Sequence, residues 1–531
     1  MHKQIDYSFP YPSRRPLVCA ENVVATSQPL AAQAGLHMLQ QGGNAVDAAL
    51  AAAIAATVVE PTGCGLGGDA FALFWDGQAM QCLNGSGPSP QAWTPEVFSH
   101  LQRMPSRGWL SVTVPGVVAS WEALSQKYGS LPFAALFQPA ITYARQGFLV
   151  SPTIAELWQK IIPKYADQPG FADYFLPQGR APRAGEQFVN PDLADSLALI
   201  AKEGAAVFYE GILADKMLAH SDQHGGLLRK TDLANYQPEW LHSIVQGFAG
   251  YEVHQVPPNT QGIAVLIALG ILKNFELESY DPDSPAFIHL CIEAMKLAFA
   301  DTAAYVADPA FTDFDSEALL SAEYLAYRAS LIDPQQANEY TAGAPNAGGT
   351  VYVCAADSRG QMVSFIQSNY EGFGSGIVVP DTGISMQNRG MGFSLEQGHP
   401  NYIDSGKRPF HTIIPGFVTQ DNQPELAFGV MGGPMQAQGH VQMVLRVCTF
   451  KQNPQTAIDA PRWQFQHGKR VLVEASMSEQ VVRTLKSLGH DIHRDEGEAV
   501  FSFGGAQLIQ RVAGGYIAGS DGRKDGLAVG F

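Results

Sequence analysis

The sequence pattern changes from helix-like to strand-like between residues 333 and 349, and this change restricts the folds that the chain can adopt. From about Pro115 to Phe299 apolar residues recur mostly at helical spacing, whereas beyond Thr350 short alternating runs typical of strands predominate, apart from a helix expected around Met477 to Leu488. The stretch between them is polar and rich in small residues, which predicts an exposed connection open to cleavage. A helix-rich part followed by a strand-rich part predicts an α+β fold in which helices flank packed sheets.

Local patterns predict several individual elements. Ser27 to Val59 reads as two helices joined by a Gly-Gly stop, with Asn44 or Asp47 capping the second. Ala70 to Leu83 alternates and predicts a hairpin, and His289 to Tyr305 predicts a strongly amphipathic helix. At 531 residues, we expect either two domains or one large layered unit.

Composition excludes several function classes. The balance of 33 basic against 50 acidic residues gives a net charge of −17, which disfavours nucleic acids and anionic membranes as partners. Met1 to Asp6 lacks the apolar stretch of a secretory signal, so a cytoplasmic location is expected. The six cysteines contain no CxxC pair, which predicts free thiols and no zinc cluster. Neither a cofactor nor a metal is expected.

Gly348-Gly349-Thr350 opens the strand-rich part and has the form of a hidden N-terminal nucleophile. A threonine hydroxyl is weak alone, but cleavage of the Gly349–Thr350 bond would free an α-amine on the same residue, which could act as its base. An α-amine titrates near about pH 8, so an appreciable fraction is neutral at working pH. The motif alone is equally compatible with a glycine turn that leads into a strand.

Several segments, in order, resemble the γ-glutamyltranspeptidase family, also called glutathione hydrolases. They are Gly43-Asn44-Ala45-Val46-Asp47-Ala48-Ala49, Gly65-Leu66-Gly67-Gly68, Val114-Pro115-Gly116, Glu293-Ala294-Met295-Lys296, Asp308-Pro309 and Lys407-Arg408-Pro409. The resemblance implies the N-terminal-nucleophile hydrolase fold, a four-layer αββα sandwich. It also implies a precursor cut before Thr350 into a large chain, 1–349, and a small chain, 350–531, which remain associated as one composite domain.

The resemblance further implies a chemistry. Thr350 falls on the family's nucleophile, which attacks an amide carbonyl to form an acyl-enzyme that water or an amine then resolves. Gly432 and Gly433 match the glycine pair that donates backbone N–H groups to the oxyanion, and Ser368 matches a hydroxyl that bonds the nucleophile.

The chain departs from the family where γ-glutamyl donors are held. The arginine that binds the donor's α-carboxylate is replaced by Asn84, which cannot reproduce a bidentate guanidinium. The aspartate that binds the α-amine is replaced by Gly392, and Arg389 stands nearby. A family serine pair becomes His411-Thr412, and a family asparagine aligns with Tyr370, after Asn369. This pattern is similar to the divergent branch that includes cephalosporin and glutaryl acylases. The predicted substrate-binding residues are therefore Asn84, Asn369, Tyr370, Arg389, His411 and Thr412.

Three functional hypotheses follow. The first is an autoprocessed amidohydrolase and acyltransferase acting on γ-glutamyl compounds such as glutathione, as the family implies. The second is the same machinery acting as an acylase on glutaryl-like or other side chains, which would suit Arg389. The third is an uncleaved, non-catalytic protein that binds small peptides. A small amide substrate is the expected partner, and the heterodimers could associate further.

Overall fold

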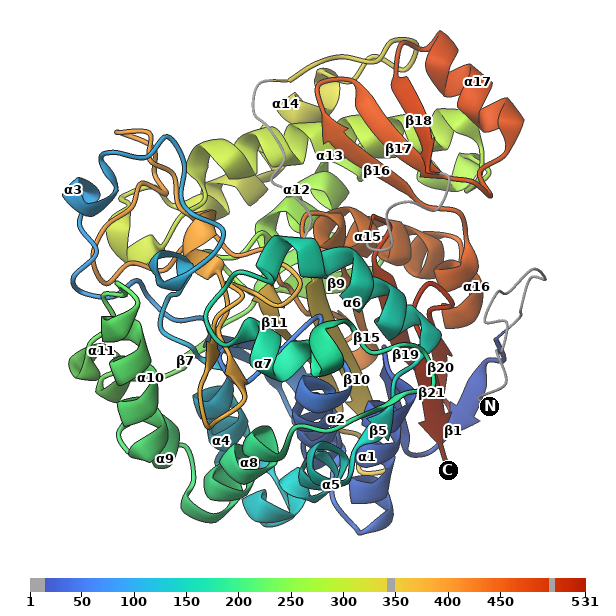
Figure 1. Cartoon of the computed structure of the whole chain (residues 1–531). Helices are drawn as coiled ribbons and strands as arrows, with labels where there is room; N and C mark the ends of the chain where they lie inside the picture. The colour runs from blue at the N-terminus through green and yellow to red at the C-terminus, as the bar shows by residue number, and fades with distance from the viewer. Residues whose placement is uncertain (1–14, 341–348, 496–501) are drawn as a thin grey trace.

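Two seven-stranded antiparallel sheets form the centre of the molecule in the computed structural model, which describes residues 15–340, 349–495 and 502–531 (Figure 1). The first sheet runs in the order β1 (Val18–Ala20), β20 (Gly515–Ser520), β19 (Gly505–Val512), β15 (Gln423–Met431), β14 (Gly416–Gln420), β9 (Tyr251–Gln255) and β8 (Ile244–Phe248). The second runs in the order β21 (Leu527–Gly530), β2 (Val23–Thr26), β10 (Gly349–Ala356), β11 (Met362–Tyr370), β3 (Asp69–Trp75), β4 (Met80–Gly85) and β7 (Glu239–Leu241).

Helices cover the outer face of each sheet. The second sheet packs against α1 (Pro29–Gln40), α2 (Ala45–Val59) and α4 (Val117–Tyr128). Helix α5 (Gln138–Gln146) packs on α2, and α8 (Pro191–Glu203) packs on α5. The first sheet packs against α12 (Gly262–Leu272) and α15 (Met435–Val444), and α13 (Pro285–Tyr305) packs on the outer side of α12. A third apolar cluster, including Tyr352, Ile366 and Phe417, lies between the sheets. The predicted four-layer αββα sandwich is therefore confirmed.

Further helices and strands make up much of the rest of the described residues. The remaining helices are α3 (Pro95–Phe98), α6 (Pro152–Tyr165), α7 (Phe171–Phe175), α9 (Ala206–Tyr209), α10 (Ile212–Gln223), α11 (Lys230–Ala234), α14 (Ala322–Ser330), α16 (Pro454–Asp459) and α17 (Glu479–Ser487). The remaining strands are β5 (Phe148–Leu149), β6 (Gln187–Phe188), β12 (Val378–Val379), β13 (Ile384–Ser385), β16 (Trp463–His467), β17 (Arg470–Glu474) and β18 (Asp491–Asp495). Strands β16, β17 and β18 form a small third sheet that lies with α17 against α13 (Figure 1).

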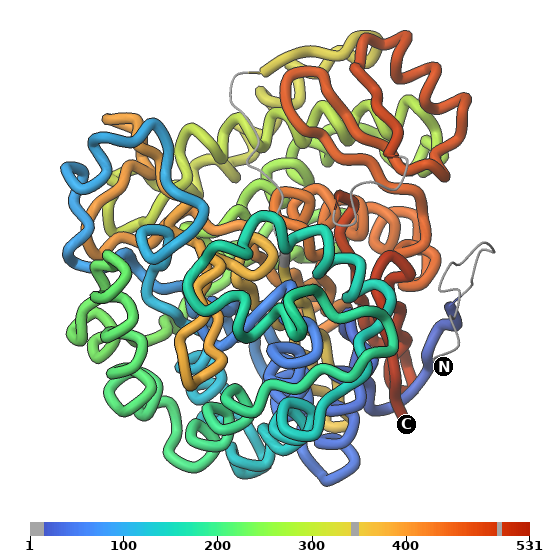
Figure 2. The backbone as a smooth tube through the Cα atoms, in the orientation of Figure 1, coloured from blue at the N-terminus to red at the C-terminus, as the bar shows by residue number. Residues whose placement is uncertain are grey.

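Segments from opposite ends of the sequence pair directly in both large sheets. Strand β10 pairs with β2 on one side and with β11 on the other, and β11 pairs in turn with β3. The backbone trace shows the early strand β1 beside the last strands of the chain (Figure 2), where it pairs with β20. Strands from before and after position 350 are therefore shared between the two large sheets.

The start of α2 shows how local sequence fixes this arrangement. Asn44 and Asp47 form a capping box: Asn44 Oδ1 accepts from Asp47 N at 3.0 Å and Asp47 Oδ2 accepts from Asn44 N at 2.9 Å. Ala45 N donates to Asp357 Oδ2 at 2.7 Å. Because Asp357 directly follows β10, this bond ties the helix start to the far end of that strand.

Two secondary-structure expectations are wrong. Helix α13 is not amphipathic: each residue from Phe287 to Thr302 is buried, because α12 covers one side and β16 and α17 another. The strand-rich part contains α15 and α16 besides the one helix expected there, α17. The segment from Pro115 to Phe299 is mostly helical, as predicted, with the short strands β5 to β9 between its helices.

The six cysteines are free, as predicted. Among the described residues, none of the helices combines the length and apolarity needed to cross a bilayer.

Candidate active site

Thr350 is buried at the head of β10, with an exposed fraction of 1%. The pairing of β10 with β11 shifts register between Gly349 and Val351, so Thr350 lies at a bulge, a distortion that re-aims side chains near active sites. Thr350 Oγ1 donates to Ser368 Oγ at 3.2 Å, and Gln436 Nε2 donates to Thr350 Oγ1 at 3.3 Å. The predicted contact between Thr350 and Ser368 is present, and Gln436 is a second partner that sequence reasoning missed.

Gly432 and Gly433 form the turn between β15 and α15. Their φ angles are 124° and 61°, a backbone region that favours glycine. Gly433 O accepts from Gln436 N at 3.0 Å and from Gln261 Nε2 at 2.9 Å. Gln436 therefore connects the threonine hydroxyl with the glycine turn, and Gln261 holds the turn from the other side.

The end of β11 carries three of the predicted residues. Ser368 Oγ accepts from Tyr370 N at 2.7 Å, and Tyr370 has a φ of 78°, unusual for a bulky side chain. Asn369 Nδ2 donates to Ser385 Oγ at 3.0 Å, while Asn369 Oδ1 is buried and has no hydrogen-bond partner within the described residues. This strained strand end therefore leaves an acceptor available next to Ser368.

Arg389 opens the 3-10 helix η7 (Arg389–Gly392) and is buried, with an exposed fraction of 1%. Its Nη1 donates to Thr412 Oγ1 at 2.9 Å, and its guanidinium carbon lies 4.3 Å from the centroid of the Tyr370 ring. Within the described part of the chain, its Nε and Nη2 have no hydrogen-bond partner. Burial lowers the pKa of Arg389 to about 10, against the raising effect of Asp69. The guanidinium thus stays charged and retains two unused donors.

The side chain of His411 is hydrogen-bonded to the carboxylate of Asp69 and is not available to bind a ligand. Its Nε2 lies 3.0 Å from Asp69 Oδ2, and its Nδ1 accepts from Ile413 N at 3.4 Å. Burial, assisted by Arg389, holds the pKa of His411 well below its ordinary value, so the neutral ring donates to Asp69. Burial raises the pKa of Asp69 to about 7, although Arg389 opposes this shift. His411 therefore adds no second cation beside Arg389.

The side chain of Asn84 is likewise hydrogen-bonded to other residues of the protein. Its Nδ2 donates to Asn259 Oδ1 at 3.1 Å, and its Oδ1 accepts from Ser86 N at 3.0 Å and from Ser86 Oγ at 2.7 Å. The Asp308-Pro309 and Lys407-Arg408-Pro409 motifs are bonded to each other and to the segment that contains Asn84. Arg408 N donates to Asp308 Oδ2 at 2.7 Å, and Arg408 Nε donates to Ser86 O at 3.1 Å.

Gly392 cannot be exchanged for an acid without rearrangement. A Cβ added there would lie 2.6 Å from the carbonyl oxygen of Phe410, a separation that real Cβ atoms do not tolerate. The backbone around η7 therefore leaves no room for the family's aspartate at this position.

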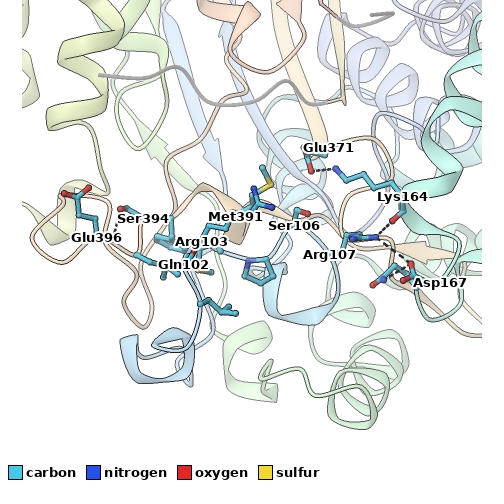
Figure 3. A pocket seen from close by; sticks show the side chains of 16 residues that line it. Gln102, Arg103, Ser106, Arg107, Lys164, Asp167, Glu371, Met391, Ser394 and Glu396 are labelled. Atoms are coloured by element: carbon cyan, nitrogen blue, oxygen red, sulfur yellow. Dashed lines mark hydrogen bonds and ion pairs between the residues drawn. The ribbon is translucent and has the colours of Figure 1, made fainter. Parts of the chain in front are cut away.

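A cavity of about 1080 Å³ adjoins η7 and the end of β11. Figure 3 shows Glu396 and Ser394 toward one end and, toward the other, two ion pairs: Lys164 Nζ to Glu371 Oε2 at 2.6 Å, and Arg107 Nη1 to Asp167 Oδ1 at 3.8 Å. Arg103 also lines the cavity and has no ion pair within the described residues. Glu371 directly follows Tyr370, so the cavity begins one residue beyond the strand end that pairs with Gly349.

Two antiparallel sheets between helical layers, with a buried threonine at the head of a central strand, define the class of N-terminal-nucleophile hydrolases. The γ-glutamyltranspeptidase family profile matches residues 31–531. The chain is 37% identical over 528 residues to a glutathione hydrolase-like proenzyme of Bacillus subtilis, covering 97% of this chain and 99% of that protein. It is 34% identical over 518 residues to an oxamate amidohydrolase proenzyme of Klebsiella pneumoniae, covering 94% and 97%.

Among solved structures, a cephalosporin acylase from Bacillus halodurans superposes with a TM-score of 0.94 at 47% identity, covering 99% of both chains. The chain belongs to the γ-glutamyltranspeptidase family.

Proposed function

We propose that this protein is an autoprocessing amidohydrolase and acyltransferase whose nucleophile is Thr350. One observation chiefly supports the proposal: Thr350 Oγ1 lies at a bulge within hydrogen-bond distance of Ser368 and Gln436. Gln436 also bonds the turn formed by Gly432 and Gly433. Relatives described as proenzymes agree with a chain that is cut after synthesis.

In the processing step, Thr350 Oγ1 attacks the carbonyl carbon of Gly349. The C–N bond breaks, the acyl group passes to oxygen as an ester, and the hydroxyl proton passes to the departing amine. Water then hydrolyses the ester, which ends the covalent link to chain 1–349 and leaves Thr350 with a free α-amine. That amine is the base that deprotonates its own hydroxyl in turnover.

In turnover, the hydroxyl of Thr350 attacks the amide carbonyl of the donor and forms an ester with the acyl group. The amine leaves with a proton from the α-ammonium, and water or a second amine resolves the ester. The N–H groups of Gly432 and Gly433 are the proposed donors to the developing oxyanion, and each such donor contributes about 3 kcal/mol of transition-state stabilisation.

Arg389 indicates the class of acyl donor. Its buried guanidinium has two unused donors beside Tyr370 and Thr412, which suits a carboxylate at the far end of the acyl chain. γ-Glutamyl and glutaryl groups both carry this carboxylate, and they differ only in the α-amine. Because Gly392 supplies no acid for an amine, we propose that both classes are accepted and that the amine contributes little to binding.

The leaving amine would occupy the cavity that begins at Glu371. Arg103 on its wall suits amines that carry a carboxylate, such as amino acids and short peptides. Since an acceptor amine attacks the ester from the side where the first amine left, the same cavity would hold acceptors.

The first experiment is denaturing electrophoresis of the purified protein with N-terminal sequencing of any small fragment. Two fragments, the smaller beginning at Thr350, are expected, and Thr350→Ala should give one full-length band without activity. A single persistent band for the wild type would support the third hypothesis, an uncleaved binding protein. Comparison of γ-glutamyl- and glutaryl-p-nitroanilide then tests the donor class, and a strong preference for γ-glutamyl would contradict the weak role proposed for the amine.

A further inference from the structure

A second cavity, of about 330 Å³, lies between the C-terminal half of α13 and the segment that follows η7. Its walls come from α13, from residues 392–401, from Phe410 and from Gln261 at the start of α12. Phe393 and Ser394 line both this cavity and the one that begins at Glu371. The two cavities therefore share this short segment as a wall.

The second cavity offers apolar surface and no carboxylate, ammonium or guanidinium group. Its apolar lining residues are Phe299, Ala303, Val306, Phe393 and Phe410. Among the described residues that line it, none is a lysine, arginine, aspartate or glutamate, whereas six such residues line the first cavity. A charged group is costly to place in apolar surroundings without a partner, so the second cavity suits an uncharged, apolar group.

Polar side chains in the wall of the second cavity are bonded within the protein. Thr302 Oγ1 donates to Ala298 O at 2.7 Å. Asn401 Nδ2 donates to Gly392 O, and Asn401 Oδ1 accepts from Phe410 N at 3.0 Å. These side chains are already satisfied and need no hydrogen bond from a ligand.

Gln261 connects the second cavity with the proposed catalytic site. Its Nε2 donates to Gly433 O at 2.9 Å, in the proposed oxyanion turn, and also to Thr412 O. Thr412 Oγ1 accepts from Arg389 Nη1 at 2.9 Å, where the donor carboxylate is proposed to bind. Gln261 thus contacts groups at both ends of the acyl chain, and we expect the chain between them to pass beside the second cavity.

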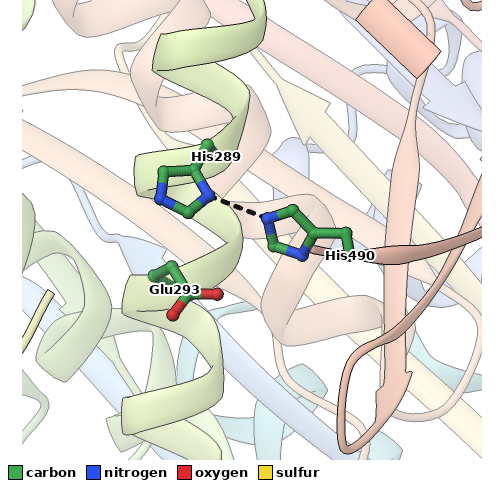
Figure 4. Close-up of side chains that lie close together, drawn as sticks. All are labelled: His289, Glu293 and His490. Carbon is green, nitrogen blue, oxygen red and sulfur yellow. Dashed lines mark hydrogen bonds between the residues drawn. The ribbon is translucent and has the colours of Figure 1, made fainter. Parts of the chain in front are cut away.

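The wall formed by α13 is held by contacts along the helix. Near the cavity, Arg328 Nη2 on α14 lies 2.9 Å from Asp301 Oδ1 and donates to Leu297 O at 3.1 Å. Toward the other end of the helix, His289 Nδ1 lies 2.8 Å from Nε2 of His490, the residue directly before β18 (Figure 4). Because α13 is tied to α14 and to the third sheet, this wall is fixed in advance, as in most ligand sites.

We propose that the second cavity is a subsite for an apolar substituent of aromatic size, carried by the acyl group on the carbon next to its carboxylate. The proposal rests on the function proposed above. In a γ-glutamyl donor this carbon carries the α-amine, and Gly392, which lines the cavity, has no side chain to bind it. A cavity of about 150 Å³ holds benzene in another protein, so the second cavity, at about 330 Å³, has room for a benzyl group.

The test compares two substrates of the processed wild type: glutaryl-p-nitroanilide, and the same compound with a benzyl group on the carbon next to the free carboxylate. Burial of the ring should raise kcat/KM about 10- to 100-fold. Ala303→Phe and the smaller change Ala303→Leu fill the cavity from α13. The matched control is Ala304→Phe, because Ala304 is the next residue of the same helix, is exposed and does not line the cavity.

The quantity measured is the preference, defined as kcat/KM for the benzyl substrate divided by kcat/KM for glutaryl-p-nitroanilide. It should fall by at least about fivefold in both Ala303 variants and stay within about twofold of wild type in Ala304→Phe, with the Tm of each variant recorded. Equal kcat/KM for the two substrates in the wild type, which requires no variant to fold, would refute the subsite, as would an equal loss of preference in Ala304→Phe. If the wild type hydrolyses neither substrate, the proposed function fails and the subsite with it, which is a different outcome.

Discussion

Replacing Arg389 by glutamine should have opposite effects on activity and on stability. In the free protein the guanidinium is buried and two of its nitrogens have no hydrogen-bond partner within the described residues. An unpaired buried charge is destabilising, so below pH 7, where Asp69 is protonated, Arg389→Gln should leave the Tm unchanged or raise it. The same two donors are the proposed ligands of the donor carboxylate, so activity should fall.

The size of this fall can be worked out. Truncating one member of a desolvated charge pair costs about 2 to 5 kcal/mol, and a hydrogen bond to a charged group contributes about 1.5 to 3 kcal/mol. Taking about 2 to 4 kcal/mol, with tenfold per about 1.4 kcal/mol, kcat/KM for glutaryl-p-nitroanilide should fall about 30- to 700-fold. Pentanoyl-p-nitroanilide has the same chain length without the carboxylate, and its kcat/KM should change less than threefold.

The assay compares both substrates with the processed wild type and variant, and records the Tm of each on a precursor that cannot be cut. An equal loss for the two substrates would show that Arg389 supports the catalytic threonine and not the donor carboxylate. A marked drop in Tm would show that the guanidinium is a structural group. Either result would refute the reasoning.

Three further predictions concern neighbouring groups. Gln436→Ala removes one hydrogen bond to the nucleophile, worth about 0.5 to 1.5 kcal/mol, so processing and turnover should both slow about two- to tenfold by timed electrophoresis and initial rates; unchanged rates would exclude Gln436 from the site. Burial raises the pKa of Asp69 to about 7, so below pH 7 it is protonated and leaves the charge of Arg389 uncompensated, whereas above pH 7 its carboxylate repels the donor. KM for glutaryl-p-nitroanilide should therefore rise several-fold between pH 6 and pH 8, and a similar rise in Asp69→Asn would contradict this origin. Arg103→Gln should lower kcat/KM about two- to fivefold for a glutaryl anilide with a carboxylate on the leaving group, but should not change kcat/KM for glutaryl-p-nitroanilide. The distant surface variant Arg483→Gln should change kcat/KM for neither substrate. Equal effects of Arg103→Gln on both substrates would show that Arg103 does not belong to the leaving-group site.

The parts of the site that sequence could predict are those encoded in short segments. Gly432 and Gly433 have positive φ angles that favour glycine, so a Gly-Gly pair after an apolar run locates the turn. Thr350 follows a polar connection and begins an alternating run, so its place at the head of a strand is readable from the sequence. In each case the residue type and the local backbone requirement agree.

The missed residues act across the fold. Gln436 contacts a residue 86 positions away, Gln261 reaches Gly433 across 172 positions, and Asp69 meets His411 across 342. No local pattern marks these contacts, because they depend on how the two sheets stack. For the same reason the sequence could not show that Asn84 and His411 are already bonded to the protein, or that Arg389 is the group with donors to spare.

The interleaving of strands has a consequence for the lifetime of the processed protein. Strand β2 lies between β21 and β10, and β10 and β11 lie between β2 and β3, so strands from both sides of position 350 are interleaved in the second sheet. A cut before Thr350 would not change this strand order as long as the protein remains folded. Once the sheets opened, the two fragments would have to meet again in solution, so refolding would become a bimolecular reaction that slows with dilution. The durability of the mature enzyme would then be governed by how slowly it unfolds, and not by a folding equilibrium.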